Sequence, residues 1–153
     1  MENLSLRGAN IDDEAFLGDL FFDVRSDEFA LAGLSLEQLK PLMAMQYATQ
    51  KQSYQWTFPN AEQSIIEFEG ERIGRLLITR NDGKVHLIDI SILRGFRGKR
   101  IGSAVLKRLK SEAEMIILRV FKTNFGVINL YERHEFITVC EDGEYVEMEW
   151  KNA

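Results

Sequence analysis

The sequence Ile88–Ala113, IDISILRGFRGKRIGSAVLKRLKSEA, contains a strand pattern, a basic turn and a helix pattern in direct succession. Isoleucine stands at every second position from 88 to 92, which predicts a strand with one buried face. From residue 101 onward, apolar residues recur every three or four positions, as in an amphipathic helix. The turn between them, RGFRGKRIG, is rich in glycine and arginine and leads directly into the helix.

This junction is a candidate anion site. The first backbone N–H groups of a helix have no intrahelical partner and lie at the positive end of the helix dipole. A phosphate group fits there, with Arg97, Lys99 and Arg100 adding charge and with Gly98 and Gly102 allowing close approach to the main chain. The spacing matches neither the P-loop nor the dinucleotide-binding G-x-G-x-x-G. The alternative is an ordinary turn whose basic side chains are solvated.

The composition is typical of a globular protein with an acidic balance. The 153 residues are 45% hydrophobic and carry a formal net charge of −5, and we expect one domain over residues 1–153. The negative charge argues against nucleic acid or an anionic membrane as partner, because both bind proteins through their phosphates. The sequence shows no membrane span or signal-peptide pattern, so we expect a cytoplasmic protein. One cysteine, Cys140, and two histidines suggest no metal site.

Periodicity along the rest of the chain predicts a mixed sheet with helices packed on it, an α/β or α+β domain. Leu4–Arg7 can form a first strand, and capping residues at 10–13 precede a helix. Ser35 and Gln38 form a capping box for a second helix that we expect to reach about Tyr54. The later elements are predicted as strands 63–68, 73–79 and 84–93, the helix from 101, strand 115–121, helix 124–134 and a hairpin of 136–140 with 145–150.

Arg97–Gly102, RGKRIG, resembles the Q/R-x-x-G-x-G/A signature of the GNAT superfamily of acetyl-CoA-dependent N-acetyltransferases. Arg100 stands where the first glycine of that signature is usual. In the family this loop wraps the pyrophosphate of coenzyme A, chiefly through main-chain amides. An arginine whose side chain points outward is therefore compatible with the resemblance.

A second motif supports the resemblance. Asn124 followed by Leu130–Phe136, LYERHEF, is similar to the family's N-x-x-A-x-x-L-Y-x-x-x-G-F, with Val127 in place of alanine and Glu135 in place of glycine. The order of predicted elements is also that of the family, so the resemblance covers most of the chain. It implies a mixed, mostly antiparallel central sheet of six or seven strands flanked by about four helices. Because many relatives dimerise, we expect a possible homodimer, with Tyr145–Trp150 as the sheet edge.

The resemblance implies that acetyl-CoA binds as a co-substrate along the strand and loop described above. In the family the strand before the loop is splayed from its neighbour, and its free main-chain groups bond the pantetheine arm and the acetyl oxygen. The implied cofactor-binding residues are Ile90, Ser91, Ile92, Arg97, Gly98, Lys99, Arg100, Ile101, Gly102, Ser103, Asn124 and Tyr131.

Tyr131 is also the candidate general acid, because the resemblance implies that its hydroxyl donates a proton to the departing thiolate. The sequence pattern alone would make it a packing residue. Asn124 lies two helical turns earlier and shares its helix face. An amine acceptor must lose a proton, and Asp89 and His86 are the candidate bases. Each has an ordinary alternative, because Asp89 can satisfy local backbone donors and His86 can be a surface residue.

The predicted function is direct transfer of an acetyl group from acetyl-CoA to a primary amine of a small molecule or peptide. The acceptor stays open among polyamines, aminoglycosides, amino acids and protein amines. A candidate lining for its pocket is the aromatic and amide-rich set Met45, Gln46, Tyr47, Gln50, Tyr54, Trp56 and Phe58. Two alternatives remain: a non-catalytic acyl-CoA-binding or sensor protein on the same fold, and an interaction protein whose basic loop binds another anion.

Overall fold

The computed structural model describes residues 1–153 and is built around a seven-stranded sheet with strand order β1-β2-β3-β4-β5-β7-β6. Only the β4–β5 pair is parallel, which confirms the predicted mixed, mostly antiparallel sheet. The strands are β1 (Leu4–Gly8), β2 (Glu62–Phe68), β3 (Glu71–Asn81), β4 (Lys84–Ile92), β5 (Met115–Phe121), β6 (Ile137–Asp142) and β7 (Tyr145–Lys151).

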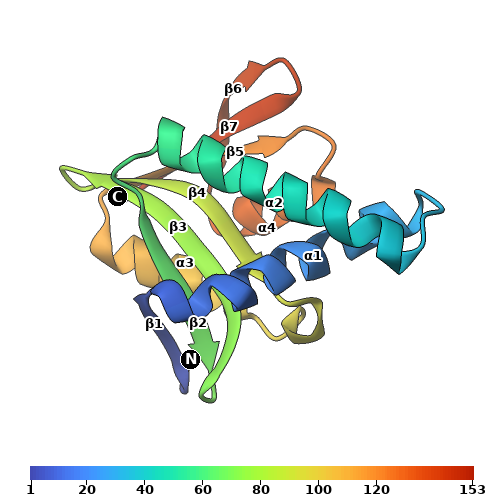
Figure 1. Ribbon diagram of the computed structural model, residues 1–153. Helices are drawn as coiled ribbons and strands as arrows, with labels where there is room; N and C mark the ends of the chain where they lie inside the picture. Colours follow the sequence, from blue (N-terminus) through green and yellow to red (C-terminus); the bar gives the residue numbers. More distant parts are fainter.

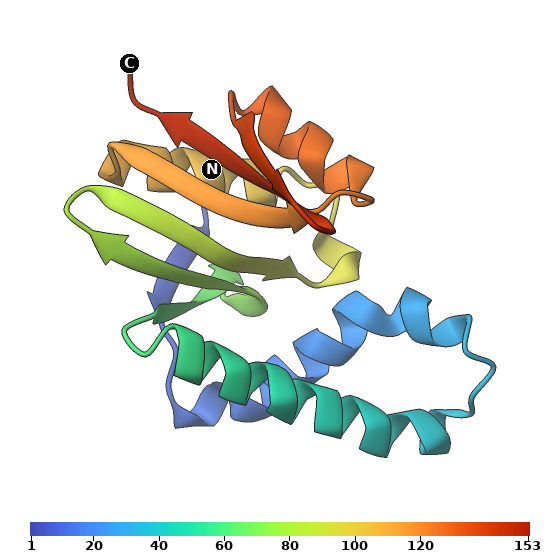
Figure 2. The same cartoon turned by 90° about the horizontal axis from the view of Figure 1, so that it is seen from above.

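Four α-helices lie in two layers, one on each face of the sheet (Figures 1 and 2). One layer consists of α1 (Glu14–Ala30) and α2 (Leu36–Thr57), and the other of α3 (Ile101–Glu112) and α4 (Phe125–Arg133). Short 3-10 turns, Ile11–Asp13 and Arg94–Phe96, precede α1 and follow β4. No helix combines the length and the apolar character that crossing a bilayer would require.

The predicted capping box fixes the start of α2. Ser35 Oγ accepts from the Gln38 N–H at 3.2 Å, and Gln38 Oε1 accepts from the Ser35 N–H at 2.9 Å. Two backbone donors that would otherwise lack partners are satisfied in this way. The helix then extends three residues beyond the predicted end, to Thr57.

The two faces of the sheet differ in their cores. The α3/α4 face carries a cluster of 18 buried residues, which includes Phe136 and Tyr131. The α1/α2 face holds two small clusters, of four and three buried residues. Each fully buried leucine, isoleucine or phenylalanine contributes about 1.5–3 kcal/mol, so most of the apolar stabilisation comes from the α3/α4 face.

A bulge in β4 decides which side chains reach each face. Leu77 pairs with Asp89 but Ile78 pairs with Leu87, so Ile88 is an extra residue in β4. Ile90 therefore packs against the large α3/α4 core, as Leu87 does. Side chains alternate along a strand, so Asp89 is turned to the α1/α2 face.

The parallel pairing of β4 with β5 is short. It joins Lys84–His86 to Met115–Ile117 and extends no further. Beyond these residues the strands separate, so Leu87–Ile92 has a strand partner only in β3. This is the splayed strand that the resemblance implied.

The expectation that Tyr145–Trp150 forms the sheet edge is wrong. That strand, β7, is hydrogen-bonded to β5 on one side and to β6 on the other. The edge strand at this end of the sheet is β6, Ile137–Asp142, all six residues of which are exposed, and the edge strand at the other end is β1.

Candidate active site

The loop between β4 and α3 has a backbone that turns through the left-handed region twice. Gly98 has φ of 79° and Arg100 has φ of 62°. The glycine usual at the position of Arg100 in the family signature is explained by this conformation, which glycine adopts freely. For arginine it costs about 1 kcal/mol, and the arginine side chain is exposed.

Six consecutive backbone N–H groups in this loop, from Gly98 to Ser103, donate no hydrogen bond to any group of the chain. The first amide of this region that does so is that of Ala104, which donates to the Arg100 carbonyl at 3.0 Å. Successive free amides at the start of a helix form an anion-binding concavity. The region therefore fits the pyrophosphate of a coenzyme A molecule, which needs many donors and positive charge.

Neighbouring elements brace the loop on both sides. The Arg94 N–H donates to Asp23 Oδ2 of α1 at 2.8 Å, and the Arg94 guanidinium pairs with Asp27 on the same helix. On the other side, Ser103 Oγ and His134 Nε2, at the end of α4, form a 2.8 Å hydrogen bond. The loop is therefore held between α1 and α4.

The main chain of Ile90–Ile92 is held on one edge only. It pairs with Gly74–Leu76 of β3, and the opposite edge faces the gap beside β5. The approach of the two strands is very close at Gly74, where a Cβ atom would lie 2.3 Å from the Ser91 carbonyl oxygen. Ile90, Ser91 and Ile92 thus have the free edge that their predicted role needs, and that role stays a prediction.

Tyr131 lies on α4 with 5% of its surface exposed, its ring 5.3 Å from that of Phe136. The Tyr131 hydroxyl makes no hydrogen bond within the chain. Every side-chain polar atom that is fully buried does make one, so this hydroxyl is partly accessible to solvent. Burial, with a smaller contribution from the charge of Asp89, raises the pKa of Tyr131. The hydroxyl is therefore a protonated donor that makes no hydrogen bond within the chain.

Asn124 caps the start of α4, and its Oδ1 atom accepts a hydrogen bond from the Val127 N–H at 3.4 Å.

Asp89 is part of a polar network on the α1/α2 face. Its Oδ2 atom accepts from Arg75 Nε at 3.1 Å, from Arg75 Nη2 at 2.6 Å and from Ser91 Oγ at 2.8 Å. Its Oδ1 atom accepts no hydrogen bond from the chain. Because every fully buried side-chain polar atom has a hydrogen-bond partner, Oδ1 must be accessible to solvent or to a ligand.

Arg75 was missed by the sequence reasoning. It is 8% exposed and also donates to Gln50 Oε1 of α2 at 3.4 Å. The available signal was a charged residue in the middle of the apolar strand sequence RIGRLLIT. A buried arginine needs a carboxylate partner, and the bulge at Ile88 supplies one by turning Asp89 to this face.

His86 lies apart from that network. It is half-buried against the ring of Phe58, edge-on at 5.2 Å, and it makes no hydrogen bond to Asp89, Ser91 or Tyr131. Burial lowers its pKa, so the ring is neutral near pH 7. Asp89 and Tyr131 lie near enough for the charge of Asp89 to contribute to the raised pKa of Tyr131. His86 remains a separate candidate base.

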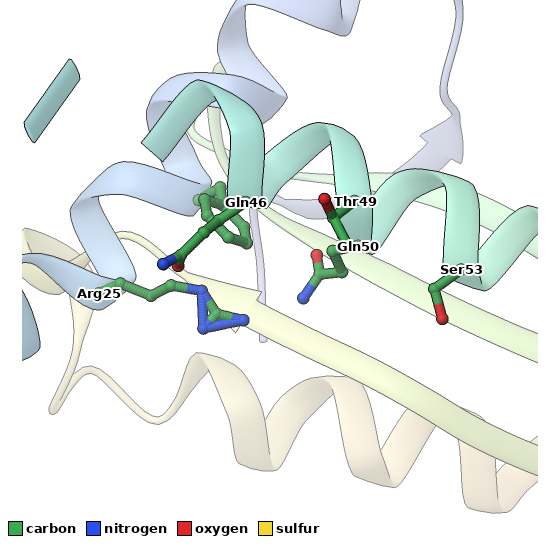
Figure 3. Close-up of a pocket in the computed structure, with 6 residues that line it drawn as sticks. Arg25, Gln46, Thr49, Gln50 and Ser53 are labelled. Atoms are coloured by element: carbon green, nitrogen blue, oxygen red, sulfur yellow. The ribbon is translucent and has the colours of Figure 1, made fainter. Parts of the chain in front are cut away.

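A pocket of about 410 Å³ lies between α1 and α2 (Figure 3). Of the residues predicted to line an acceptor pocket, Gln46 and Gln50 line this one, but Met45 and Trp56 are 60% and 89% exposed, and Tyr47 packs on Phe21. The full lining is Phe21, Arg25, Gln46, Thr49, Gln50 and Ser53. Arg25, Thr49 and Ser53 were missed, because no sequence pattern says which polar residues of two helices face each other.

Comparison with known proteins agrees with this geometry. A model of the acetyltransferase (GNAT) family matches residues 33–136. The chain belongs to the GNAT family. The predicted resemblance is thereby confirmed, and with it acetyl-CoA as the acetyl donor that the family uses. No curated protein sequence gives a significant match.

Solved structures of other GNAT proteins share the fold over nearly the whole chain. PaiA N-acetyltransferase from Thermoplasma acidophilum, in complex with coenzyme A, is 18% identical with a TM-score of 0.72, covering 97% of this chain and 99% of that one. An acetyltransferase from Thermus thermophilus is 18% identical with a TM-score of 0.71, covering 98% and 97%. The ribosomal-protein-S18-alanine N-acetyltransferase of Escherichia coli is 12% identical with a TM-score of 0.64, covering 97% and 93%. At these identities the likeness shows the fold.

Proposed function

We propose that this GNAT protein is an acetyl-CoA-dependent N-acetyltransferase that transfers the acetyl group directly to a primary amine. The observation that carries the proposal is the row of free amides from Gly98 to Ser103 beside the open edge of β4. Acetyl-CoA, when bound, supplies the acetyl group as a thioester. The remaining chemistry belongs to groups of this chain.

The main chain performs binding and polarisation. The amides of 98–103, with Arg97 and Lys99, hold the pyrophosphate, and the free edge of Ile90–Ile92 aligns the pantetheine arm. A backbone N–H on that edge, aimed at the acetyl oxygen, stabilises the negative charge that develops there. Such a donor contributes on the order of 3 kcal/mol.

Two side chains manage the protons. Tyr131 holds a proton at Oη and gives it to the departing sulfur, a step typically worth about 10²- to 10⁴-fold in rate. Asp89 Oδ1, open and without a partner, accepts the hydrogen bond of the incoming amine and takes its proton directly or through one water. His86 is the second candidate for that base, because its ring is neutral near pH 7.

Calorimetric titration with acetyl-CoA, with coenzyme A and ADP as controls, tests the first half of this proposal. We expect binding of acetyl-CoA and coenzyme A in the micromolar range, and weaker binding of ADP, which lacks the pantetheine arm. A thiol-release assay with a panel of amines tests the second half. Binding without transfer to any amine would favour the acyl-CoA sensor, and no binding at about 1 mM acetyl-CoA would overturn the proposal.

A further inference from the structure

The pocket between α1 and α2 has an unusual charge balance for a protein that is acidic as a whole. Arg25 is its only charged lining residue, and no carboxylate lines it. Arg25 makes no ion pair, and its guanidinium carbon lies 4.2 Å from the centre of the Phe21 ring. Stacking on an aromatic face removes water from one side of a guanidinium while leaving its N–H donors free.

The other groups around Arg25 are hydrogen-bonding and neutral. Gln46 reaches toward Arg25 from α2, and Thr49, Gln50 and Ser53 follow it along the same helix (Figure 3). Gln46, Gln50 and Ser53 offer amide and hydroxyl donors beside a planar cation, whereas the Thr49 hydroxyl already donates to the Met45 carbonyl oxygen at 2.9 Å. This combination suits a carboxylate, which accepts paired N–H bonds from a guanidinium.

Arg75, on the same face, does not add positive charge to the pocket. Arg75 is ion-paired with Asp89 and joined to the pocket through its 3.4 Å hydrogen bond to Gln50. Gln50 therefore connects the pocket lining to Asp89 through Arg75. In the pocket Arg25 lacks an anionic partner, and beyond Arg75 the Asp89 Oδ1 atom lacks a donor.

We propose that the acceptor is an amine that also carries a carboxylate, bound with its carboxylate on Arg25 in the α1/α2 pocket and its amine toward Asp89. This inference rests on the proposed N-acetyltransferase function and names its substrate class. It disfavours polyamines and aminoglycosides, which would bring several positive charges into a pocket whose only charge is positive. A pocket of about 410 Å³ has room for an amino acid or a short acidic peptide.

The test uses acceptors in matched pairs in which a carboxamide replaces the only carboxylate, such as L-leucine with L-leucinamide and L-phenylalanine with L-phenylalaninamide, with spermidine as the polycation. The readout is kcat/KM for thiol release at saturating acetyl-CoA. We expect the carboxylate member of a pair to be preferred roughly 10-fold or more. Preference for the amide or for spermidine would overturn the inference while leaving the acetyltransferase function intact.

Arg25→Gln separates the pocket from the rest of the site. We expect it to lower kcat/KM for carboxylate acceptors roughly 10- to 100-fold, mainly by raising KM. The kcat/KM for amide acceptors should change less than about 3-fold. Arg25→Lys should recover part of the loss, because it keeps the charge without the planar fork. Lys40→Gln removes the same charge at an exposed position of α2 and should leave both acceptors unchanged. Equal losses for carboxylates and amides in Arg25→Gln would overturn the inference.

A second measurement does not depend on turnover. Protein saturated with coenzyme A is titrated calorimetrically with the same carboxylate amines, and we expect binding that Arg25→Gln removes. Retained affinity in Arg25→Gln, or no binding of any carboxylate amine at about 10 mM, would overturn the inference. Failure of the proposed function is recognised separately, as failure of the wild-type protein to bind acetyl-CoA.

Discussion

The two faces of the central sheet present different kinds of polar group. The α3/α4 face presents main-chain groups: free amides from Gly98 to Ser103 and the open edge of Ile90–Ile92. A core of 18 buried residues lies directly beneath them. The α1/α2 face presents side chains, Arg25, Gln46 and Asp89 among them, over small clusters of four and three residues.

Under the proposed function, this contrast follows from what each face binds. A pyrophosphate is recognised by backbone amides, so side chains in its loop can vary as long as the turn geometry persists. An acceptor is recognised by charges and hydrogen bonds from individual side chains, which a few substitutions can exchange. We therefore expect substitutions on the α3/α4 face to affect cofactor binding and chemistry for every acceptor, and those in the α1/α2 pocket to affect acceptor choice.

The largest expected effect comes from Gly102→Glu, which places a side chain and a negative charge against the pyrophosphate. Acetyl-CoA binding should weaken roughly 100-fold or more by calorimetry. The fold should survive, because a Cβ at this position would lie 3.8 Å from Ile92 and 3.9 Å from Leu130. Ser111→Glu, at the other end of α3, adds the same charge and should bind acetyl-CoA normally. Unchanged affinity in Gly102→Glu would mean that another loop holds the cofactor.

Tyr131→Phe should lower kcat about 100-fold while changing acetyl-CoA affinity less than about 3-fold. The hydroxyl makes no hydrogen bond within the chain, so its removal should cost little stability. The loss should be the same for every acceptor, unlike that of Arg25→Gln. Unchanged turnover would remove the proton-donor role and leave Tyr131 as a packing residue.

The α3/α4 face was largely predictable from the sequence because its motifs are local. The strand, turn and helix of Ile88–Ala113 encode their own geometry, and Asn124–Phe136 encodes α4 and its cap. The backbone explains the glycines of the family motifs: Arg100 and Glu135, which stand at two of those glycine positions, both have left-handed φ, 62° and 69°. The family motifs mark these two positions in the sequence, and the backbone conformation gives the physical reason why glycine is usual there.

The α1/α2 face was not predictable to the same depth because its site is assembled from distant segments. Arg25 and Gln46 meet only once α1 and α2 pack together, and helical periodicity in a largely exposed pair does not specify that contact. The partnership of Arg75 with Asp89 depends on the bulge at Ile88, which a regular alternation of strand residues hides. The edge position of β6 likewise follows from long-range strand order, which local pattern leaves open.

Gly74→Ala tests the close contact between β3 and β4 beside the candidate site. Its new Cβ would lie 2.3 Å from the Ser91 carbonyl oxygen, so β3 and β4 must shift apart beside the site. We expect a loss of about 1–3 kcal/mol in the free energy of unfolding, seen as a fall of several degrees in Tm. Gly8→Ala, in β1 with open space around it, should change stability by less than about 0.5 kcal/mol. Equal Tm values for the two variants would show that β4 yields freely.

The smallest expected effect concerns the backbone of the second motif. Glu135 is exposed with φ of 69°, so Glu135→Gly should relieve left-handed strain and stabilise the protein by about 0.5–1 kcal/mol in denaturant unfolding. The same substitution three residues earlier, Glu132→Gly, falls inside α4 and should destabilise by about 1 kcal/mol. Opposite signs would confirm that the family glycine serves the chain's conformation at this turn. Destabilisation in both variants would instead assign the Glu135 side chain a favourable contact, for which the Lys110 ammonium is the candidate partner because it interacts electrostatically with Glu135.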